Sequence, residues 1–213
     1  MIEIGTAIRL PTEYGTVIVR HVQFRRAPSE SGPAAAPPEK EGIVVSNDLP
    51  TFSTPTLVRL QSSCLFGEAL WATDCDCGLQ LHLSLGEIIR ENGLLLYLYE
   101  EGRGAGLRRK IEAIALQQTL GIESDEAFQC LSLDSDLRTY EAASEALVAI
   151  LGSNPKVVLL TNNPAKARGL TAHGIEVVGT RKLIPEKLTE KVKVYLRKKR
   201  ERLGHSISEE DLK

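Results

Sequence analysis

Three of the four cysteines in this 213-residue chain lie close together, in the segment CLFGEALWATDCDCG that begins at Cys64. Thiolate sulfur is a soft ligand that suits zinc. Cys64, Cys75 and Cys77 can converge on one ion if Asp76 lets the chain turn between the last two cysteines. Three protein ligands with one open position are typical of catalytic zinc, which lowers the pKa of its bound water to about 7. The cluster therefore predicts a zinc site.

The cluster has two other interpretations on the residues alone. Free cysteines are often buried as small apolar side chains, although a Cys-x-Cys sequence beside a glycine is an unusual core pattern. A closed structural zinc site would need a fourth ligand, for which His82 and Cys130 are candidates. His82 follows Cys77 on an expected helix, so it lies within reach. The cysteines alone do not separate a structural site from a catalytic one.

The elements that must position these cysteines include both strands and helices. Runs rich in β-branched residues predict early strands at 4–10, 15–22, 42–47 and 54–60. After the cysteines, apolar residues at helical spacing alternate with short apolar runs. They predict helices at 79–92, from Leu107, at 139–151 and within 161–174, and strands at 93–99, 156–160 and 175–180. This alternation predicts an α/β fold with a mixed sheet flanked by helices.

The chain, residues 1–213, is long enough to bury a core and is expected to form a single domain. The segment RRAPSESGPAAAPPEKEG predicts a flexible Pro/Ala-rich loop at about 26–41, because it cannot bury enough apolar surface to offset its chain entropy. The basic segment at 186–204 predicts a helix with a solvated face that is available for a subunit contact.

Composition argues against several classes of function. Hydrophobic residues make up 42% and charged residues 25%, and the net charge of -2 gives no footprint for nucleic acid or an anionic membrane. No run approaches the roughly 18 apolar residues of a membrane span, and MIEIGTAIRLPTEYG lacks the pattern of a signal peptide. We therefore expect a cytoplasmic protein, in which cysteines stay reduced and a cluster of them indicates metal binding or catalysis.

Two further segments follow predicted strands and begin helices. EEGRGAGL, residues 100–107, lies where α/β sheets usually hold ligands, and its glycines allow close backbone approach while the helix N-terminus attracts phosphate. It matches neither the dinucleotide fingerprint nor the P-loop, so a plain strand-to-helix turn explains it equally well. In TNNPAK, Thr161 and Lys166 could hold phosphate or ribose oxygens. Asn163 as N-cap and Pro164 as first helical residue would explain the same segment without a ligand.

Asp136 and Arg138 also have an ordinary interpretation. Asp136 would cap the N-terminus of the following helix, and Arg138 would form a surface ion pair worth under about 1 kcal/mol. On the residues alone this interpretation is favoured. A carboxylate two residues from an arginine in an extended loop can nevertheless point to the same side as that arginine.

Four motifs, in the same order along the chain, resemble the GTP cyclohydrolase II family, whose members open the guanine ring at the head of riboflavin synthesis. They are SSCLFGEALWATDCDCGLQL, YEEGRGAGLRRKIEAIALQ, DLRTY at 136–140 and LLTNNPAK at 159–166. The likeness extends from Leu10 to His205. It implies a partly barrel-like mixed sheet, a homodimer, and hydrolysis of GTP with release of pyrophosphate and formate. The implied product is a 2,5-diamino-6-ribosylamino-pyrimidinone 5′-phosphate.

The resemblance also implies roles for individual residues. The zinc, whose water attacks C8 of the base, would be held by Cys64, Cys75 and Cys77, without His82. The nucleotide would contact Glu101 and Arg103, with Gln80 nearby, and its triphosphate would contact Arg59, Thr161 and Lys166. Arg138, assisted by Asp136, would attack the α-phosphorus while magnesium binds the phosphates. Deprotonating a free guanidinium at pH 7 costs roughly 7 kcal/mol, so proton removal would be concerted with the attack.

Two positions depart from the family pattern. Ser63 stands where an acidic residue normally precedes the first cysteine, and Ile114 stands where the helix after the glycine loop normally has a tyrosine. Loss of the carboxylate would weaken magnesium or triphosphate binding. Loss of the phenol removes a proton donor and acceptor beside the zinc, unless Tyr97 or Tyr99 replaces it. The alternatives are an enzyme that retains the formyl group or takes another nucleotide, and a catalytically silent nucleotide-binding protein.

Overall fold

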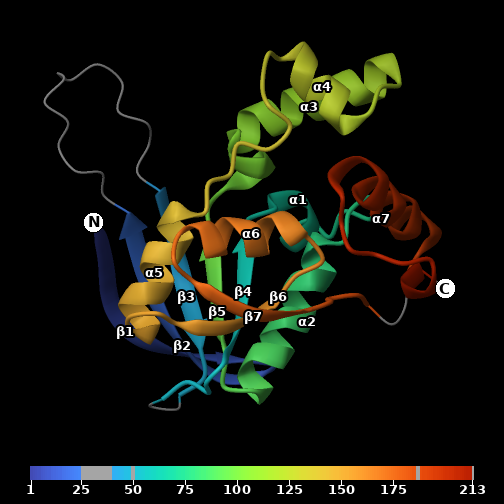
Figure 1. Ribbon diagram of the computed structural model, residues 1–213. Coiled ribbons are helices and arrows are strands. Elements are labelled where there is room, and N and C mark those ends of the chain that lie inside the picture. Colours follow the sequence, from blue (N-terminus) through green and yellow to red (C-terminus); the bar gives the residue numbers. More distant parts are fainter. Residues whose placement is uncertain (25–39, 49–50, 186–187, 213) are drawn as a thin grey trace, which may run out of the picture.

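The computed structural model describes residues 1–24, 40–48, 51–185 and 188–212. Within these ranges seven strands form one sheet in the order β1-β2-β3-β5-β4-β6-β7 (Figure 1). The strands are β1 (Ile2–Thr12), β2 (Gly15–Phe24), β3 (Lys40–Ser46), β4 (Thr56–Ser62), β5 (Leu94–Leu98), β6 (Lys156–Leu160) and β7 (Glu176–Arg181). The predicted mixed α/β sheet is confirmed. Its edge strands β1 and β7 do not pair, so the sheet stays open.

The sheet has an antiparallel half and a parallel half that meet at β5. Strands β1, β2, β3 and β5 pair antiparallel, whereas β5, β4, β6 and β7 pair parallel. The apolar run LLLYL forms β5 because both faces of this strand are covered. Leu94 and Leu96 pack into the core on one face, and Leu95 packs into the core on the other. The parallel strands bring their carboxyl ends to one edge, where such sheets usually hold ligands.

Helices cover both faces of the sheet. They are α1 (Leu65–Glu68), α2 (Cys77–Arg90), α3 (Gly106–Leu120), α4 (Ser124–Cys130), α5 (Glu141–Leu151), α6 (Pro164–Ala172) and α7 (Glu190–Leu203). On one face, α5 and α6 bury Leu147 and Leu170 in the larger core cluster. On the other face, α2 buries Ile88. The helices predicted from periodicity are confirmed, whereas α1 and α4 were not predicted because both are short and α4 has the largely polar sequence SDEAFQC.

Two smaller units stand beside the carboxyl edge of the parallel strands (Figure 1). Helices α3 and α4 project from the sheet and pack on each other through a cluster that includes Ala113 and Phe128. Helix α7 folds against the C-terminal segment through Val192, Leu196 and Ile207. These two units form walls of the cavity described below.

The Pro/Ala-rich loop predicted at about 26–41 lies outside the described residues, except for Lys40 and Glu41, which begin β3. Among the described residues, no helix combines the length and the apolar character needed to cross a membrane.

Candidate active site

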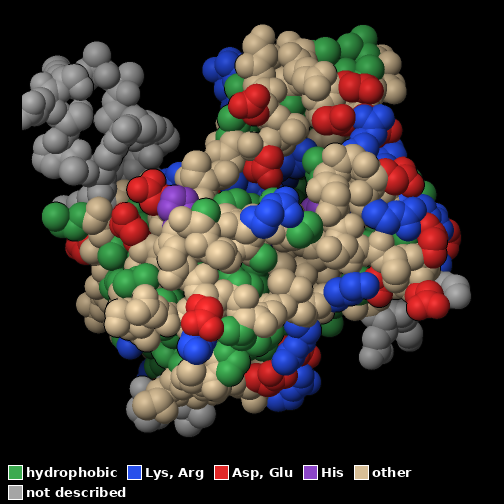
Figure 2. Space-filling view, viewed as in Figure 1, with side chains coloured by type: hydrophobic (Ala, Val, Ile, Leu, Met, Phe, Trp, Pro, Cys, Tyr) green, Lys and Arg blue, Asp and Glu red, His purple; other side chains and the backbone are tan. Residues whose placement is uncertain are grey.

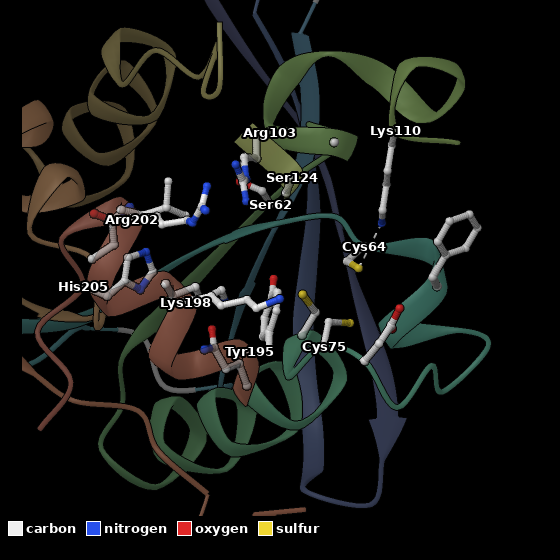
Figure 3. Close-up of a pocket in the computed structure, with 18 of the residues that line it drawn as sticks. Ser62, Cys64, Cys75, Arg103, Lys110, Ser124, Tyr195, Lys198, Arg202 and His205 are labelled. Carbon is white, nitrogen blue, oxygen red and sulfur yellow. Dashed lines mark hydrogen bonds between the residues drawn. The ribbon is translucent and has the colours of Figure 1, made fainter. Parts of the chain in front are cut away.

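A cavity of about 680 Å³ lies at the carboxyl edge of the parallel strands, between the α3–α4 unit and α7 (Figure 3). Each of three neighbouring strands delivers site residues directly after it ends. Cys64 follows β4, Glu101 follows β5 and Thr161 follows β6. The cavity lining contains ten of the eleven residues singled out from the sequence: Arg59, Cys64, Cys75, Cys77, Gln80, Glu101, Arg103, Arg138, Thr161 and Lys166. The remaining residue, Asp136, contacts Arg138.

The three predicted cysteines converge. The sulfur atoms of Cys64, Cys75 and Cys77 all lie within 4.8 Å of one another. Two glycines allow this approach, because a Cβ on Gly67 would lie 2.7 Å from the Cys75 sulfur and one on Gly78 would lie 2.3 Å from the Gly67 carbonyl oxygen. The chain turns at Asp76, which is also the residue before the first turn of α2.

The sulfur chemistry of the trio fits zinc. Hydrogen bonds from the Cys75 and Cys77 thiols hold the pKa of Cys64 far below its usual value. The bond with Cys64 in turn raises the pKa of Cys75 and of Cys77. The three sulfurs thus interact closely with one another, and a divalent cation would replace these contacts by binding three thiolates. Soft sulfur donors at this mutual spacing suit zinc rather than magnesium or calcium.

Neither candidate for a fourth protein ligand joins the trio. His82 points to the N-terminal hairpin, where its Nδ1 lies 2.5 Å from the Tyr14 hydroxyl and its ring packs beside Trp71. Cys130 is exposed at the end of α4. Among the described residues, the cluster of potential metal ligands consists of three cysteines only. The trio thus has the ligand number of a catalytic zinc site rather than that of a closed structural one.

Charged residues that the sequence interpretation missed surround Cys64. The Lys110 ammonium lies 3.2 Å from the Cys64 sulfur (Figure 3) and 2.6 Å from Glu101 Oε1. The Glu68 carboxylate accepts the Cys64 backbone N–H at 3.1 Å and the Tyr97 hydroxyl at 2.5 Å. Burial raises the pKa of Glu68. Lys110 and Glu68 both lie inside the motifs that resemble the family. Their positions in those motifs could have identified them, whereas the spacing of charged residues could not.

Arg59 and Gln80 form one hydrogen-bonded unit in the cavity wall. The Arg59 guanidinium donates to Gln61 Oε1 at 2.6 and 3.0 Å, to Gln80 Oε1 at 2.7 Å and to the Leu160 carbonyl at 3.0 Å. Burial lowers the pKa of Arg59 to about 10. These hydrogen bonds hold the Arg59 side chain rigidly on β4, where a phosphate would meet a fixed rather than a mobile cation.

The glycine turn after β5 packs against another backbone segment of the protein, at Leu137. Gly102 and Arg103 adopt left-handed φ values of 60° and 56°. A Cβ on Gly104 would lie 3.3 Å from the backbone of Leu137. The Arg103 carbonyl accepts the Leu137 N–H at 3.0 Å, and the Arg103 guanidinium donates to the Ser135 carbonyl at 3.1 Å. The glycines thus provide close approach to the segment that carries Asp136 and Arg138.

Asp136 and Arg138 form a two-point ion pair at the cavity wall. Arg138 Nε lies 2.8 Å from Asp136 Oδ1, and Nη2 lies 2.5 Å from Oδ2. Burial lowers the pKa of Arg138, but the hydrogen bonds that it donates to Asp136 and the charge of that carboxylate outweigh burial, so the net shift is upward. The capping interpretation of Asp136 is wrong, because α5 begins at Glu141 with Tyr140 as its N-cap. The surface-pair interpretation is also wrong, since the Arg138 side chain is only 14% exposed.

The TNNPAK segment forms the predicted helix start and also places Thr161 and Lys166 in the cavity lining. Asn163 caps α6 by accepting the Ala165 N–H at 2.9 Å, and Pro164 is the first helical residue. Lys166 is buried and donates to the Leu60 carbonyl at 2.7 Å. Burial, with Arg59 and Arg138 nearby, lowers its pKa well below the usual value. Among the described residues no carboxylate forms an ion pair with Lys166, so a bound anion would favour the charged form of this side chain.

The basic helix predicted near the C-terminus is confirmed as α7 and has exposed residues, but its other face lines the cavity. Tyr195, Lys198, Lys199 and Arg202 all contribute to the wall. Lys198 lies 2.8 Å from Glu123, and Arg202 lies 2.7 Å from Asp125 on α4. Figure 2 shows the resulting mixture of basic and acidic side chains over this part of the surface. The sequence showed that α7 is basic, but it did not show that α7 would pair with Glu123 and Asp125.

The two positions that depart from the expected pattern, Ser63 and Ile114, both line the cavity. Ile114 lies on α3, the helix that also carries Lys110. Tyr97 and Tyr99 pack against each other with ring centres 5.8 Å apart. The Tyr97 hydroxyl is bound to Glu68, and neither tyrosine belongs to the cavity lining.

Comparison with known proteins supplies the family. The family model described as GTP cyclohydrolase II matches residues 4–182. The riboflavin biosynthesis protein RibBA of Bacillus subtilis (strain 168) is 37% identical over 209 residues, which cover 97% of this chain and 49% of the relative. The RibBA protein of Phocaeicola vulgatus is 34% identical over 210 residues, which cover 97% and 48%. The chain spans about half the length of these relatives. It belongs to the GTP cyclohydrolase II family.

Proposed function

We propose that this protein is a zinc-dependent hydrolase that opens the imidazole ring of GTP at C8 and releases pyrophosphate and formate. The observation that carries the proposal is that one cavity is lined both by the sulfur trio and by Arg138, whose guanidinium is held by Asp136. A nucleotide-binding protein without activity would need neither an open metal position nor an arginine held by a carboxylate. The product would be a 2,5-diamino-6-ribosylamino-pyrimidinone 5′-phosphate.

Cys64, Cys75 and Cys77 would hold the zinc at the base end of the nucleotide. When bound, zinc supplies Lewis-acid activation of water for attack at C8. Gln80 and Glu101 line the cavity near the trio and would bind the nucleotide together with Arg103. The Glu101 carboxylate is fixed by Lys110 at 2.6 Å and by the Leu65 N–H at 2.8 Å, so it could accept hydrogen bonds from a guanine edge without reorganising.

Arg138 would react at the phosphate end. A guanidinium nitrogen forms a bond to the α-phosphorus, the bond from this phosphorus to the bridging oxygen breaks, and pyrophosphate leaves. The proton lost by the guanidinium passes to Asp136, whose two oxygens already contact Nε and Nη2. Water then cleaves the nitrogen–phosphorus bond. Because full deprotonation beforehand would cost roughly 7 kcal/mol, transfer to Asp136 is concerted with bond formation.

Arg59 on β4 and Lys166 on α6 would bind the triphosphate. Lys166 is the strongest candidate, because a phosphate oxygen would supply the counter-charge that the described protein does not. Arg59 and Thr161 lie on the same side of the cavity. Magnesium bound to the triphosphate, a homodimeric assembly and a cytoplasmic location are part of the same proposal and rest on the family resemblance.

The direct test measures the zinc content of the protein and the amounts of all three products. The purified protein is assayed for zinc per chain and then incubated with GTP and magnesium, while pyrophosphate, formate and the pyrimidine are quantified. We expect one zinc per chain and equal amounts of the three products. GTP that remains intact with a zinc-loaded protein would contradict the proposal.

A second candidate function follows from Ile114 in the cavity wall. Full conversion needs two hydrolytic steps, which open the ring and then free formate, and an aliphatic side chain cannot exchange protons in either step. The protein would then release pyrophosphate and retain the formyl group on the opened ring. Mass spectrometry of the product separates the two functions, and Ile114→Tyr would restore formate release. Stoichiometric formate from the wild-type protein would exclude early arrest.

A further inference from the structure

The turn between the last two cysteines contains a buried carboxylate. Asp76 is 0% exposed, and its flanking residues are Cys75 and Cys77. One carboxylate oxygen lies 2.8 Å from the Lys199 ammonium, and the other accepts the Gln80 amide. A buried carboxylate is tolerated only when it is paired and hydrogen-bonded.

Lys199 comes from the C-terminal helix rather than from any motif near the cysteines. Its side chain is 13% exposed, and its ammonium lies over the Tyr195 ring, 4.4 Å from the ring centre. The other lysine beside the trio, Lys110, is shared between Cys64 and Glu101. Lys199 is therefore the ammonium that contacts the Cys75–Cys77 turn.

A chain of hydrogen bonds extends the effect of this pair across the site. Asp76 binds Gln80, and Gln80 accepts from Arg59 at 2.7 Å. Arg59 donates to Gln61, whose amide donates to Glu68 Oε1 at 2.7 Å. The Glu68 carboxylate then accepts the backbone N–H of Cys64. One network thus fixes the backbone at both ends of the trio, with Lys199 at its outer end.

We propose that Lys199 is a positioning residue for the metal ligands, through which α7 holds the Cys75–Cys77 turn in the geometry that binds zinc. The inference rests on the proposed zinc site. It makes the C-terminal helix a functional part of that site, beyond its role as a wall. Hydrogen-bonded neighbours that orient metal ligands typically change metal affinity by about 10–100-fold when removed.

The position of α7 does not depend on Lys199 alone. The apolar cluster of Val192, Leu196, Ile207 and Leu212 packs the helix on the C-terminal segment, whose Ser206 N–H donates to the Asn162 carbonyl at 2.8 Å. Lys198 and Arg202 add ion pairs to α4. A protein with Lys199 replaced is therefore expected to fold with α7 in place, so that an effect on the metal can be separated from loss of the helix.

The experiment measures zinc affinity by competition with a chromophoric chelator in the full chain, without nucleotide. Lys199→Met is expected to weaken zinc binding about 10–100-fold and to alter the visible spectrum of the cobalt(II)-substituted protein. Lys198→Met is the matched control, because it removes the same charge from the same helix but its partner is Glu123. It should leave zinc affinity and the cobalt spectrum unchanged.

A second variant keeps the test decisive if Lys199→Met folds poorly. Asp76→Asn combined with Lys199→Met removes both charges and leaves no unpaired buried carboxylate. The double variant should fold and still bind zinc more weakly than wild type, because the tether to α7 is gone. Zinc affinity and cobalt spectra equal to wild type in either folded variant would overturn the inference. Failure of the wild-type chain to bind zinc would instead refute the proposed function as well.

Discussion

The two ends of the cavity differ in how their charges are balanced. At the sulfur end, Asp76 pairs with Lys199 and Glu101 pairs with Lys110, so both of these carboxylates have an ammonium as partner. At the phosphate end, Arg138 has Asp136, but the buried Lys166 has only the Leu60 carbonyl. The sulfur end is thus suited to a small cation, while the phosphate end contains a buried lysine without an acidic partner, whose charged form a bound anion would favour.

This difference indicates that the two ends can be disabled separately. The sulfur end is fixed by β4, α1 and the first turn of α2, and the reactive arginine lies on the segment before α5. The glycine turn after β5 is the physical link between them, because it packs on the backbone at Leu137. Substitutions that act on one end should therefore leave the other measurable.

The largest expected effect is that a substitution at each end abolishes the reaction of that end and leaves the function of the other end intact. Cys75→Ser replaces a soft ligand and should remove zinc and ring opening, while release of pyrophosphate continues. Arg138→Ala should lower pyrophosphate release by roughly 10⁴-fold or more, because it removes the nucleophile, while one zinc per chain is retained. Separate assays of zinc, pyrophosphate and ring-opened product check both variants. If both variants match wild type, or if both lose zinc, the division into two ends is wrong.

A smaller effect is expected at the buried lysine. Lys166→Met removes a desolvated charge while keeping an apolar stem of similar length, so the ligand-free protein should gain about 1 kcal/mol, or about 2–4 °C in Tm. Affinity for the triphosphate should fall about 10–100-fold, as expected for loss of a charge-assisted hydrogen bond. Thermal unfolding without nucleotide and titration with a non-hydrolysable GTP analogue measure the two effects.

Lys198→Ala is the matched control for Lys166→Met, because Lys198 lines the same cavity but already pairs with Glu123. Its loss should change stability by less than about 1 kcal/mol. A lower Tm for Lys166→Met in the absence of nucleotide would show that the buried charge stabilises the free protein, which contradicts the contrast between the two ends.

The sulfur end could be predicted from sequence more fully than its surroundings. A Cys-x-Cys pair and one earlier cysteine indicate a metal without knowledge of the fold, and the run LLLYL indicates a strand buried on both faces. Lys199 could not be found in this way, because its partner Asp76 lies 123 residues earlier and only the packing of α7 brings them together. Polar pairing over such distances leaves no periodic pattern in the sequence.

The glycine turn illustrates a different limit. Its composition correctly indicated close backbone approach, but glycine does not specify what approaches, and the structure fills that space with the backbone at Leu137. Asp136 was assigned to a cap because a helix was expected from 139, whereas α5 begins at Glu141. Helix starts can be displaced by two residues, and that displacement was enough to change the role of a carboxylate.

The smallest expected effect is a dependence of stability on pH through His205, which lines the cavity beside α7. Burial lowers its pKa to about 3, the basic groups of Lys199, Lys166 and Arg138 add to this effect, and Asp76 opposes it. Because the unfolded chain protonates near pH 6.5 and the folded chain does not, the stability that this histidine contributes is present above pH 6.5 and is lost as pH falls toward 3. At pH 6 the loss should be below about 1 kcal/mol. From pH 8 to 5, the free energy of unfolding measured with denaturant should therefore decrease less for His205→Gln than for wild type. Equal decreases in the two proteins would mean that His205 is already accessible to protons in the native state.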